Sequence, residues 1–245
     1  MTQLSPSLRL ALAELGPTLT PQLVEGTRSL FAPISARPDP SFCRVERDLA
    51  YAPHERHKLD VYIPTASGEN RPVVVYVHGG GFSMGSKGAP DEPFFNNIGA
   101  WAARTGFLGV TINYRRGHAP LAGACMMSGI YDLVRHDRMP FEDGYYGSDL
   151  SRTREQSTLV PLIDQSVPCL FSVSELDPPP FQRQAGHLVD RSLAVFSRWP
   201  KLLYLLGHNH LSPAYHLGGE GDEVGGVLAT FVKELEPYAS EARIR

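Results

Sequence analysis

The sequence predicts an α/β fold: a mostly parallel sheet with helices on both faces. Short apolar runs rich in β-branched residues alternate with amphipathic helical stretches from about residue 44 to residue 235, which is typical of doubly wound sheets. The chain has 245 residues, 42% of them hydrophobic, which suits one globular domain with one large core. We therefore expect residues 1–245 to form a single domain, with N-terminal helices and a connector in residues 1–40.

The first 40 residues carry the start and stop signals of two helices. Ser5-Pro6 opens a first amphipathic helix that Gly16-Pro17 ends, and Thr20-Pro21 opens a second that runs to about Phe31. Serine or threonine followed by proline is a favoured helix start. Residues 32–40 contain three prolines and no periodicity, so we expect a connector there.

The remaining elements follow from apolar patterning. Strands are expected at 44–51, 58–63, 73–77, 106–114, 121–128, 168–172 and 201–206, and helices at 93–105, near 161–164, at 181–196 and at 223–235. The first two strands are expected to pair. The run Val73–Val77 is apolar throughout, which is typical of a strand buried on both faces. Strand 73–77, helix 93–105 and strand 106–114 predict a right-handed parallel unit.

Charge and composition exclude several classes of partner. Lys and Arg number 23 against 26 Asp and Glu, a net charge of −3, so we expect no nucleic-acid partner. The N-terminus has no basic region, its apolar stretch is interrupted by Arg9 and Glu14, and no run reaches 18 apolar residues. We therefore expect no secretory signal, no membrane partner and a cytoplasmic location.

Three cysteines, Cys43, Cys125 and Cys169, are widely spaced. Their odd number and spacing fit neither a disulfide framework nor a CxxC metal site. We expect reduced thiols that are mostly buried, with Cys125 packed inertly inside an apolar strand.

Polar residues gather at the ends of three predicted strands, where ligands bind in such sheets. His78-Gly79-Gly80-Gly81 follows one strand, Asp177 follows another and His210 follows a third. Consecutive glycines let backbone N–H groups point at a bound oxygen, as an oxyanion hole requires. An aspartate followed later by a histidine suits an orienting acid and a general base.

These residues lie in motifs that resemble the α/β-hydrolase family, in its carboxylesterase and arylformamidase-like branch. The matching segments are Tyr76–Phe82 (YVHGGGF), Ile112–Arg115 (INYR), Met127–Leu133 (MSGIYDL), Glu175–Ala185 (ELDPPPFQRQA) and Gly207–Ser212 (GHNHLS). The resemblance implies hydrolysis of carboxylic esters or related acyl bonds on a small-molecule acyl substrate, with no cofactor and no metal.

The same resemblance assigns roles to individual residues. It implies that Asp177 is the triad acid, that His210 is the base, and that the amides of Gly80 and Gly81 are the oxyanion donors. We expect His78, with Gly79, to hold the glycine loop by hydrogen bonds and not to act on the substrate.

The sequence departs from this family where the nucleophile belongs. The family places a G-x-S-x-G turn between the INYR and MSGIYDL segments, yet only six residues separate Tyr114 from Leu121. Two crossovers with an intervening strand need about 60 residues, and six residues span only about 20 Å. We therefore predict that the central nucleophile strand, its serine and the flanking helices are missing.

Ser83 and Ser128 are the surrogate candidates for the nucleophile. Gly81-Phe82-Ser83-Met84-Gly85 matches G-x-S-x-G, but residues 86–93 contain lysine, glycine and two prolines where a helix must begin, so we interpret Ser83 as a decoy. Ser128 is expected to satisfy backbone groups at a Ser-Gly turn.

The histidines near the C-terminus allow a metal site as an alternative. His208 and His210 have the H-x-H spacing and His216 follows. Their loop supplies no carboxylate or cysteine, whereas zinc needs three or four converging ligands.

Three hypotheses for function remain. The first is an acyl hydrolase of the serine type. The second is a catalytically impaired or non-catalytic remnant that acts at most as a binding or interaction protein, with turnover about a thousandfold or more below that of an intact relative. The third is self-association through an exposed sheet edge, where a second copy supplies the missing strand.

Overall fold

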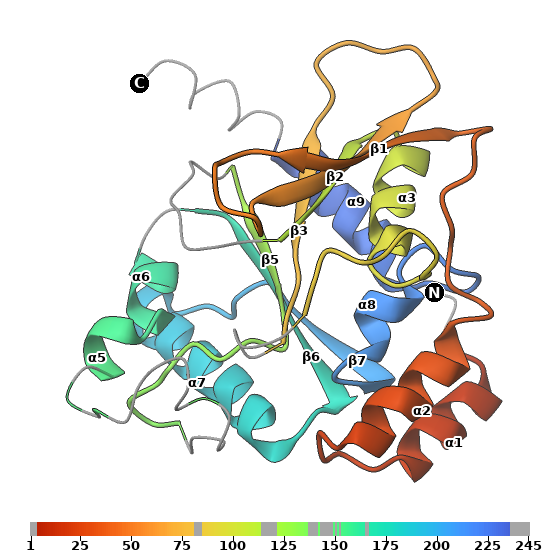
Figure 1. The fold of residues 1–245 in the computed structure, drawn as a ribbon. Coiled ribbons are helices and arrows are strands. Elements are labelled where there is room, and N and C mark those ends of the chain that lie inside the picture. Colours follow the sequence, from red (N-terminus) through yellow and green to blue (C-terminus); the bar gives the residue numbers. More distant parts are fainter. Residues whose placement is uncertain are drawn as a thin grey trace.

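The computed structural model describes residues 4–80, 85–113, 122–136, 142, 149, 151, 153–164 and 167–235. Its strands and helices alternate along the chain as the sequence predicts, and the helices lie around a central layer of strands (Figure 1). Among the described residues, no helix combines the length and the apolar character needed to cross a membrane.

The first sheet has the strand order β1-β2-β4-β3. Its strands are β1 (Cys43–Ala50), β2 (Lys58–Pro64), β3 (Val73–Val77) and β4 (Leu108–Ile112). β1 pairs antiparallel with β2, and β2 pairs antiparallel with β4. β3 and β4 are parallel neighbours joined through α3 (Asn96–Arg104), which confirms the predicted parallel pairing.

The second sheet is wholly parallel, with the order β5-β6-β7. Its strands are β5 (Ala124–Met127), β6 (Cys169–Leu176) and β7 (Leu202–Asn209). Because all three strands run in the same direction, their carboxyl ends meet at one edge. Asp177 and His210 follow directly after β6 and β7 at that edge.

One continuous sheet was expected, but the described strands form two. The division falls between β3 and β5, the position at which the sequence predicts that a nucleophile strand is missing. One core joins the two sheets: α3 and α9 (Val224–Glu234) pack with Tyr76 of β3, Met127 of β5 and Leu205 of β7. The connection over Tyr114–Leu121 lies outside the described residues, so the missing strand stays a prediction.

Other helices complete the layers. They are α5 (Thr153–Gln156), α6 (Leu159–Asp164), α7 (Pro179–Phe196) and α8 (Ser212–His216). α6 and α7 cover the second sheet on the face opposite α9, where Ile163 and Leu188 pack with Phe171. The short helices α5 and α8 were not predicted, because four or five residues are too few for a periodic signal.

Two N-terminal helices lie beside β7 and α8 (Figure 1). α1 (Pro6–Glu14) begins at Ser5, whose hydroxyl accepts a hydrogen bond from the Leu8 amide, and α2 (Pro21–Phe31) begins at Thr20, which caps the Leu23 amide. Both starts confirm the predicted serine-proline and threonine-proline signals.

The expectation that Val73–Val77 is buried on both faces is wrong. Val73, Val75 and Val77 are 55%, 50% and 53% exposed. They alternate with Val74 and Tyr76, which pack into the core with α3. Within the described residues, no helix covers the face that carries the three exposed valines, so an apolar run did not imply two covered faces here.

The cysteine prediction is wrong for one residue. All three cysteines are free thiols. Cys43 is buried and Cys169 is half-buried, but Cys125 is exposed. Cys125 lies on β5, the edge strand of the second sheet in the described structure, which accounts for its exposure.

Candidate active site

An aspartate and a histidine meet at the carboxyl edge of the second sheet. His210 Nδ1 lies 2.8 Å from Asp177 Oδ1. The carboxylate is fully buried and the imidazole is 19% exposed. The structure therefore brings together the two residues that the resemblance implies as acid and base, 33 positions apart in the sequence.

This contact fixes which ring nitrogen carries the proton. An ionised carboxylate accepts hydrogen bonds only, so Nδ1 of His210 is assigned as the donor. In the neutral ring Nε2 then has a free lone pair. That tautomer is the one a general base requires.

The second carboxylate oxygen of Asp177 has its own donors. Oδ2 accepts from the Ser128 hydroxyl at 2.6 Å and from the Ser174 amide at 2.7 Å. The Asp177 amide in turn donates to the Ser174 carbonyl at 3.1 Å. Both carboxylate oxygens are therefore occupied by donors that aim the group at His210, as a buried charge requires.

An aromatic ring holds the other side of the imidazole. The rings of Phe181 and His210 have centroids 4.1 Å apart, and Phe181 lies in the first turn of α7, buried. The proline run after Asp177 starts that helix and so places Phe181 against the base.

The glycine loop begins at the end of β3. His78 is buried, and its Nδ1 donates to the Gly79 carbonyl at 2.7 Å. Burial lowers the pKa of His78. Gly80 has φ of 116°, a conformation that glycine adopts readily and other residues do not. Gly81 and Ser83 lie outside the described residues.

At Gly85 the chain lies close to the start of the glycine loop. A Cβ on Gly85 would lie 2.5 Å from the Gly79 carbonyl oxygen and 2.6 Å from His78 Nδ1. Gly85 also has φ of 97°. Only glycine allows the chain to close back on itself this tightly.

One apolar cluster connects the glycine-loop side of the site with the acid and base. Phe94 and Phe95, which follow the loop, belong to the same cluster as Leu176 and Leu211. Those two leucines are the sequence neighbours of Asp177 and His210. The packing of α1 and α2 on this cluster therefore supports both halves of the candidate site.

The three C-terminal histidines have separate partners. Nδ1 of His208 lies 2.8 Å from the Ser212 hydroxyl, and His216 Nε2 donates to the Glu220 carbonyl at 2.8 Å. His210 is held by Asp177. Across the part of the chain that the structure describes, no three His, Cys, Asp or Glu side chains gather as metal ligands would.

Parts of the sequence are similar to known proteins. The BD-FAE family model matches residues 59–128. A probable isoprenylcysteine alpha-carbonyl methylesterase of Arabidopsis thaliana, ICMEL2, is 46% identical over 44 residues, which cover 18% of this chain and 10% of that protein. Probable carboxylesterase 7 of Arabidopsis thaliana is 29% identical over 73 residues, which cover 29% of this chain and 23% of that protein. The matches thus span less than a quarter of either relative.

The fold comparison covers nearly all of the chain. The crystal structure of an esterase from the bacterial hormone-sensitive lipase family superposes with a TM-score of 0.65 at 14% identity, over 94% of this chain and 98% of that one. The chain therefore shares the fold of this esterase structure, the α/β-hydrolase fold that the sequence motifs implied.

Within this α/β-hydrolase fold, the expectation for Ser128 is wrong. Its hydroxyl bonds to the side chain of Asp177, not to backbone. Ser128 has φ of 47°, an uncommon conformation for a non-glycine residue. The sequence did not predict the contact between Ser128 and Asp177, because the two residues are 49 positions apart. Near Asp177 the sequence offered only the three-residue spacing from Ser174, which does not indicate Ser128.

Proposed function

We propose that this chain hydrolyses carboxylic esters or related acyl bonds, with His210 as general base and Asp177 as the residue that orients it. The contact of 2.8 Å between His210 Nδ1 and Asp177 Oδ1 carries the proposal. It lies at the carboxyl edge of a parallel sheet, where α/β folds bind ligands. The two relatives of Arabidopsis thaliana are named as a probable methylesterase and a probable carboxylesterase, which supports an ester substrate.

The reaction needs a hydroxyl oxygen that attacks the acyl carbon. His210 Nε2 accepts the proton of that hydroxyl as its oxygen bonds to the carbon, and Asp177 stabilises the resulting imidazolium. The negative carbonyl oxygen is bound by the amides of Gly80 and Gly81. The bond to the leaving alkoxide then breaks, and His210 returns the proton to the departing alcohol.

We propose that water supplies this hydroxyl. Ser128 donates its hydroxyl proton to Asp177, so it is engaged by the acid and not by the base. Without a serine nucleophile, an oxyanion hole and substrate binding retain about 10³–10⁴-fold acceleration over water. Against an ordinary turnover of about 10 s⁻¹, a thousandfold loss leaves a kcat of about 0.01 s⁻¹ or less.

The test is hydrolysis of p-nitrophenyl butyrate by the purified chain. His210→Ala should lower the rate by about tenfold or more, since general-base catalysis contributes at least that much. His187→Ala, which removes a half-buried histidine of α7, is the matched control and should stay within about twofold. A His210→Ala variant as fast as the wild type would overturn the proposed role of His210.

A non-catalytic remnant is the second candidate. The observation that favours it is the division of the sheet between β3 and β5, because the nucleophile of this fold family stands on a strand at that place. A wild-type rate equal to that of buffer, from folded protein, would favour this candidate and overturn the hydrolase.

A further inference from the structure

A buried lysine lies just beyond the glycine loop. Lys87 is 5% exposed, and its Nζ lies 2.6 Å from Asp60 Oδ1 and 3.1 Å from Asp48 Oδ1. Lysine is almost never this buried unless it is paired. The contact between His210 and Asp177, with the residues that support it, does not involve this ion pair.

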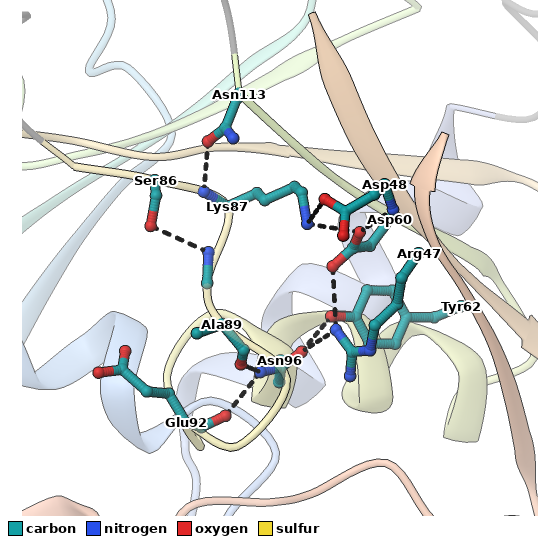
Figure 2. Close-up of polar contacts among 11 residues, drawn as sticks. Arg47, Asp48, Asp60, Tyr62, Ser86, Lys87, Ala89, Glu92, Asn96 and Asn113 are labelled. Carbon is teal, nitrogen blue, oxygen red and sulfur yellow. Dashed lines mark hydrogen bonds and ion pairs between the residues drawn. The ribbon is translucent and has the colours of Figure 1, made fainter. Parts of the chain in front are cut away.

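Asp60 of β2 is the centre of a wider network (Figure 2). It is fully buried, and besides Lys87 it accepts from Arg47 Nη1 at 2.9 Å and from the Asp48 amide at 2.8 Å. The charge of the carboxylate is thus compensated by two cations and one backbone donor. A buried carboxylate with one of these partners removed would be left under-compensated.

The network continues to the start of α3 through Asn96. Its Oδ1 accepts from Tyr62 Oη at 2.5 Å and from Arg47 Nη1 at 3.0 Å. Burial raises the pKa of Tyr62 to about 12, so the hydroxyl keeps its proton. The Asn96 amide group donates to the Ala89 and Glu92 carbonyls, both at 2.6 Å, and so fixes residues 89–92.

The backbone around Lys87 is fixed from the other side as well. The Lys87 amide donates to Asn113 Oδ1 at 2.7 Å (Figure 2), and Asn113 follows β4. Two residues earlier, Gly85 lies against Gly79 and His78. The end of the glycine loop is therefore tied to both β2 and β4.

We propose that Lys87 and Asp60 are positioning residues that hold the glycine loop in the geometry needed to bind an oxyanion. This inference rests on the proposed function. Glycines leave a loop conformationally free, whereas oxyanion donors must be fixed before the reaction begins. The buried ion pair constrains the chain at residue 87, and Gly85, which lies against Gly79, connects this constraint to the start of the glycine loop.

The first experiment is amide hydrogen exchange on the wild type and Lys87→Met. Methionine keeps much of the apolar stem and removes the charge. Exchange in peptides covering residues 78–88 should quicken by about tenfold or more, while peptides covering Asp177 and His210 stay within about twofold. Lys201→Met is the matched control: it removes a lysine from the exposed ion pair with Glu234 and should leave residues 78–88 unchanged.

A second variant keeps the test decisive if Lys87→Met does not fold. Asp60→Asn retains the size of the side chain and weakens the same ion pair, so it should loosen residues 78–88 to a smaller extent. Unchanged exchange in residues 78–88 of a folded variant would overturn the proposal. So would an equal rise across the whole chain, which marks a loss of overall stability only.

Kinetics separate this proposal from the proposed function. If the wild type hydrolyses p-nitrophenyl butyrate, Lys87→Met should lower kcat by about tenfold with KM within about threefold, because an oxyanion hole acts on the transition state. An unchanged kcat would overturn the positioning role. A wild type without His210-dependent hydrolysis would overturn the proposed function, and the exchange experiment would still decide whether Lys87 holds the loop.

Discussion

The Ser128 hydroxyl donates to Oδ2 of Asp177 at 2.6 Å, on the opposite oxygen from the one that His210 binds. Ser128 therefore completes the shell of donors around the buried acid. The arrangement gives a serine at the site a role other than that of nucleophile, and it can be tested by removing the hydroxyl alone.

Ser128→Ala should destabilise the chain by about 1.5–3 kcal/mol, the range for hydrogen bonds to charged groups. Ser192→Ala is the matched control, because the Ser192 hydroxyl is also buried but donates to the neutral Arg198 carbonyl at 2.8 Å. Its cost should be about 1 kcal/mol. Urea unfolding of the three proteins measures both values. Equal costs would show that the charge of Asp177 adds nothing to the Ser128 bond.

Local sequence signals predicted much of the fold. The starts of α1 and α2 follow from Ser5-Pro6 and Thr20-Pro21, and both β7 and α9 lie where the apolar patterns indicated. Boundaries shifted where tertiary contacts extend an element: β6 runs on to Leu176, well past the predicted end at residue 172. α3 starts only at Asn96 because Phe95 has φ of 66°, a conformation that no propensity indicates.

The structure predicts a pH dependence of stability through His208. Burial, with electrostatic contributions from the neighbouring His216 and Arg9, lowers the pKa of His208 from 6.5 to about 3. Between these two values the unfolded chain takes up a proton that the folded chain does not. Stability should therefore fall as the pH drops from about 6.5 toward 3, by up to about 1.4 kcal/mol per pH unit.

His208→Gln should flatten that dependence. Urea unfolding of both proteins between pH 7 and pH 4 measures it, and the difference between the two curves isolates His208 from the other titrating groups. A difference that stays constant with pH would contradict the buried neutral state of this ring.

The face of β3 that no described helix covers predicts self-association. Val73, Val75 and Val77 are each half or more exposed, and an uncharged β-branched strand at a sheet edge favours pairing with another chain. Sedimentation velocity should show dimers or larger species that increase with protein concentration. Val75→Lys should reduce them, because a lysine on an edge strand opposes pairing.

The matched control for that prediction is Val160→Lys, which places a lysine at a valine of α6 that is also 50% exposed. It should leave the association unchanged. A wild type that sediments as a monomer at every concentration would contradict the prediction.

Parts of the candidate site were predictable and parts were not. Asp177 and His210 stand at strand ends, so their order and position in the sequence indicated that they meet. The contacts of Ser128 with Asp177 and of Lys87 with Asp60 join residues 49 and 27 positions apart. Neither spacing follows from a helical or strand period, so only the folded structure reveals them.

The most direct test of the account is intact-mass spectrometry of the folded protein after treatment with a fluorophosphonate, which reacts with activated serines. We propose that the chain holds a working base, His210, and an acid, Asp177, and that water replaces a serine nucleophile. This proposal predicts an unmodified mass alongside slow, His210-dependent hydrolysis of p-nitrophenyl butyrate. One adduct per chain, lost in His210→Ala, would contradict it and would mean that a serine of this chain performs the attack.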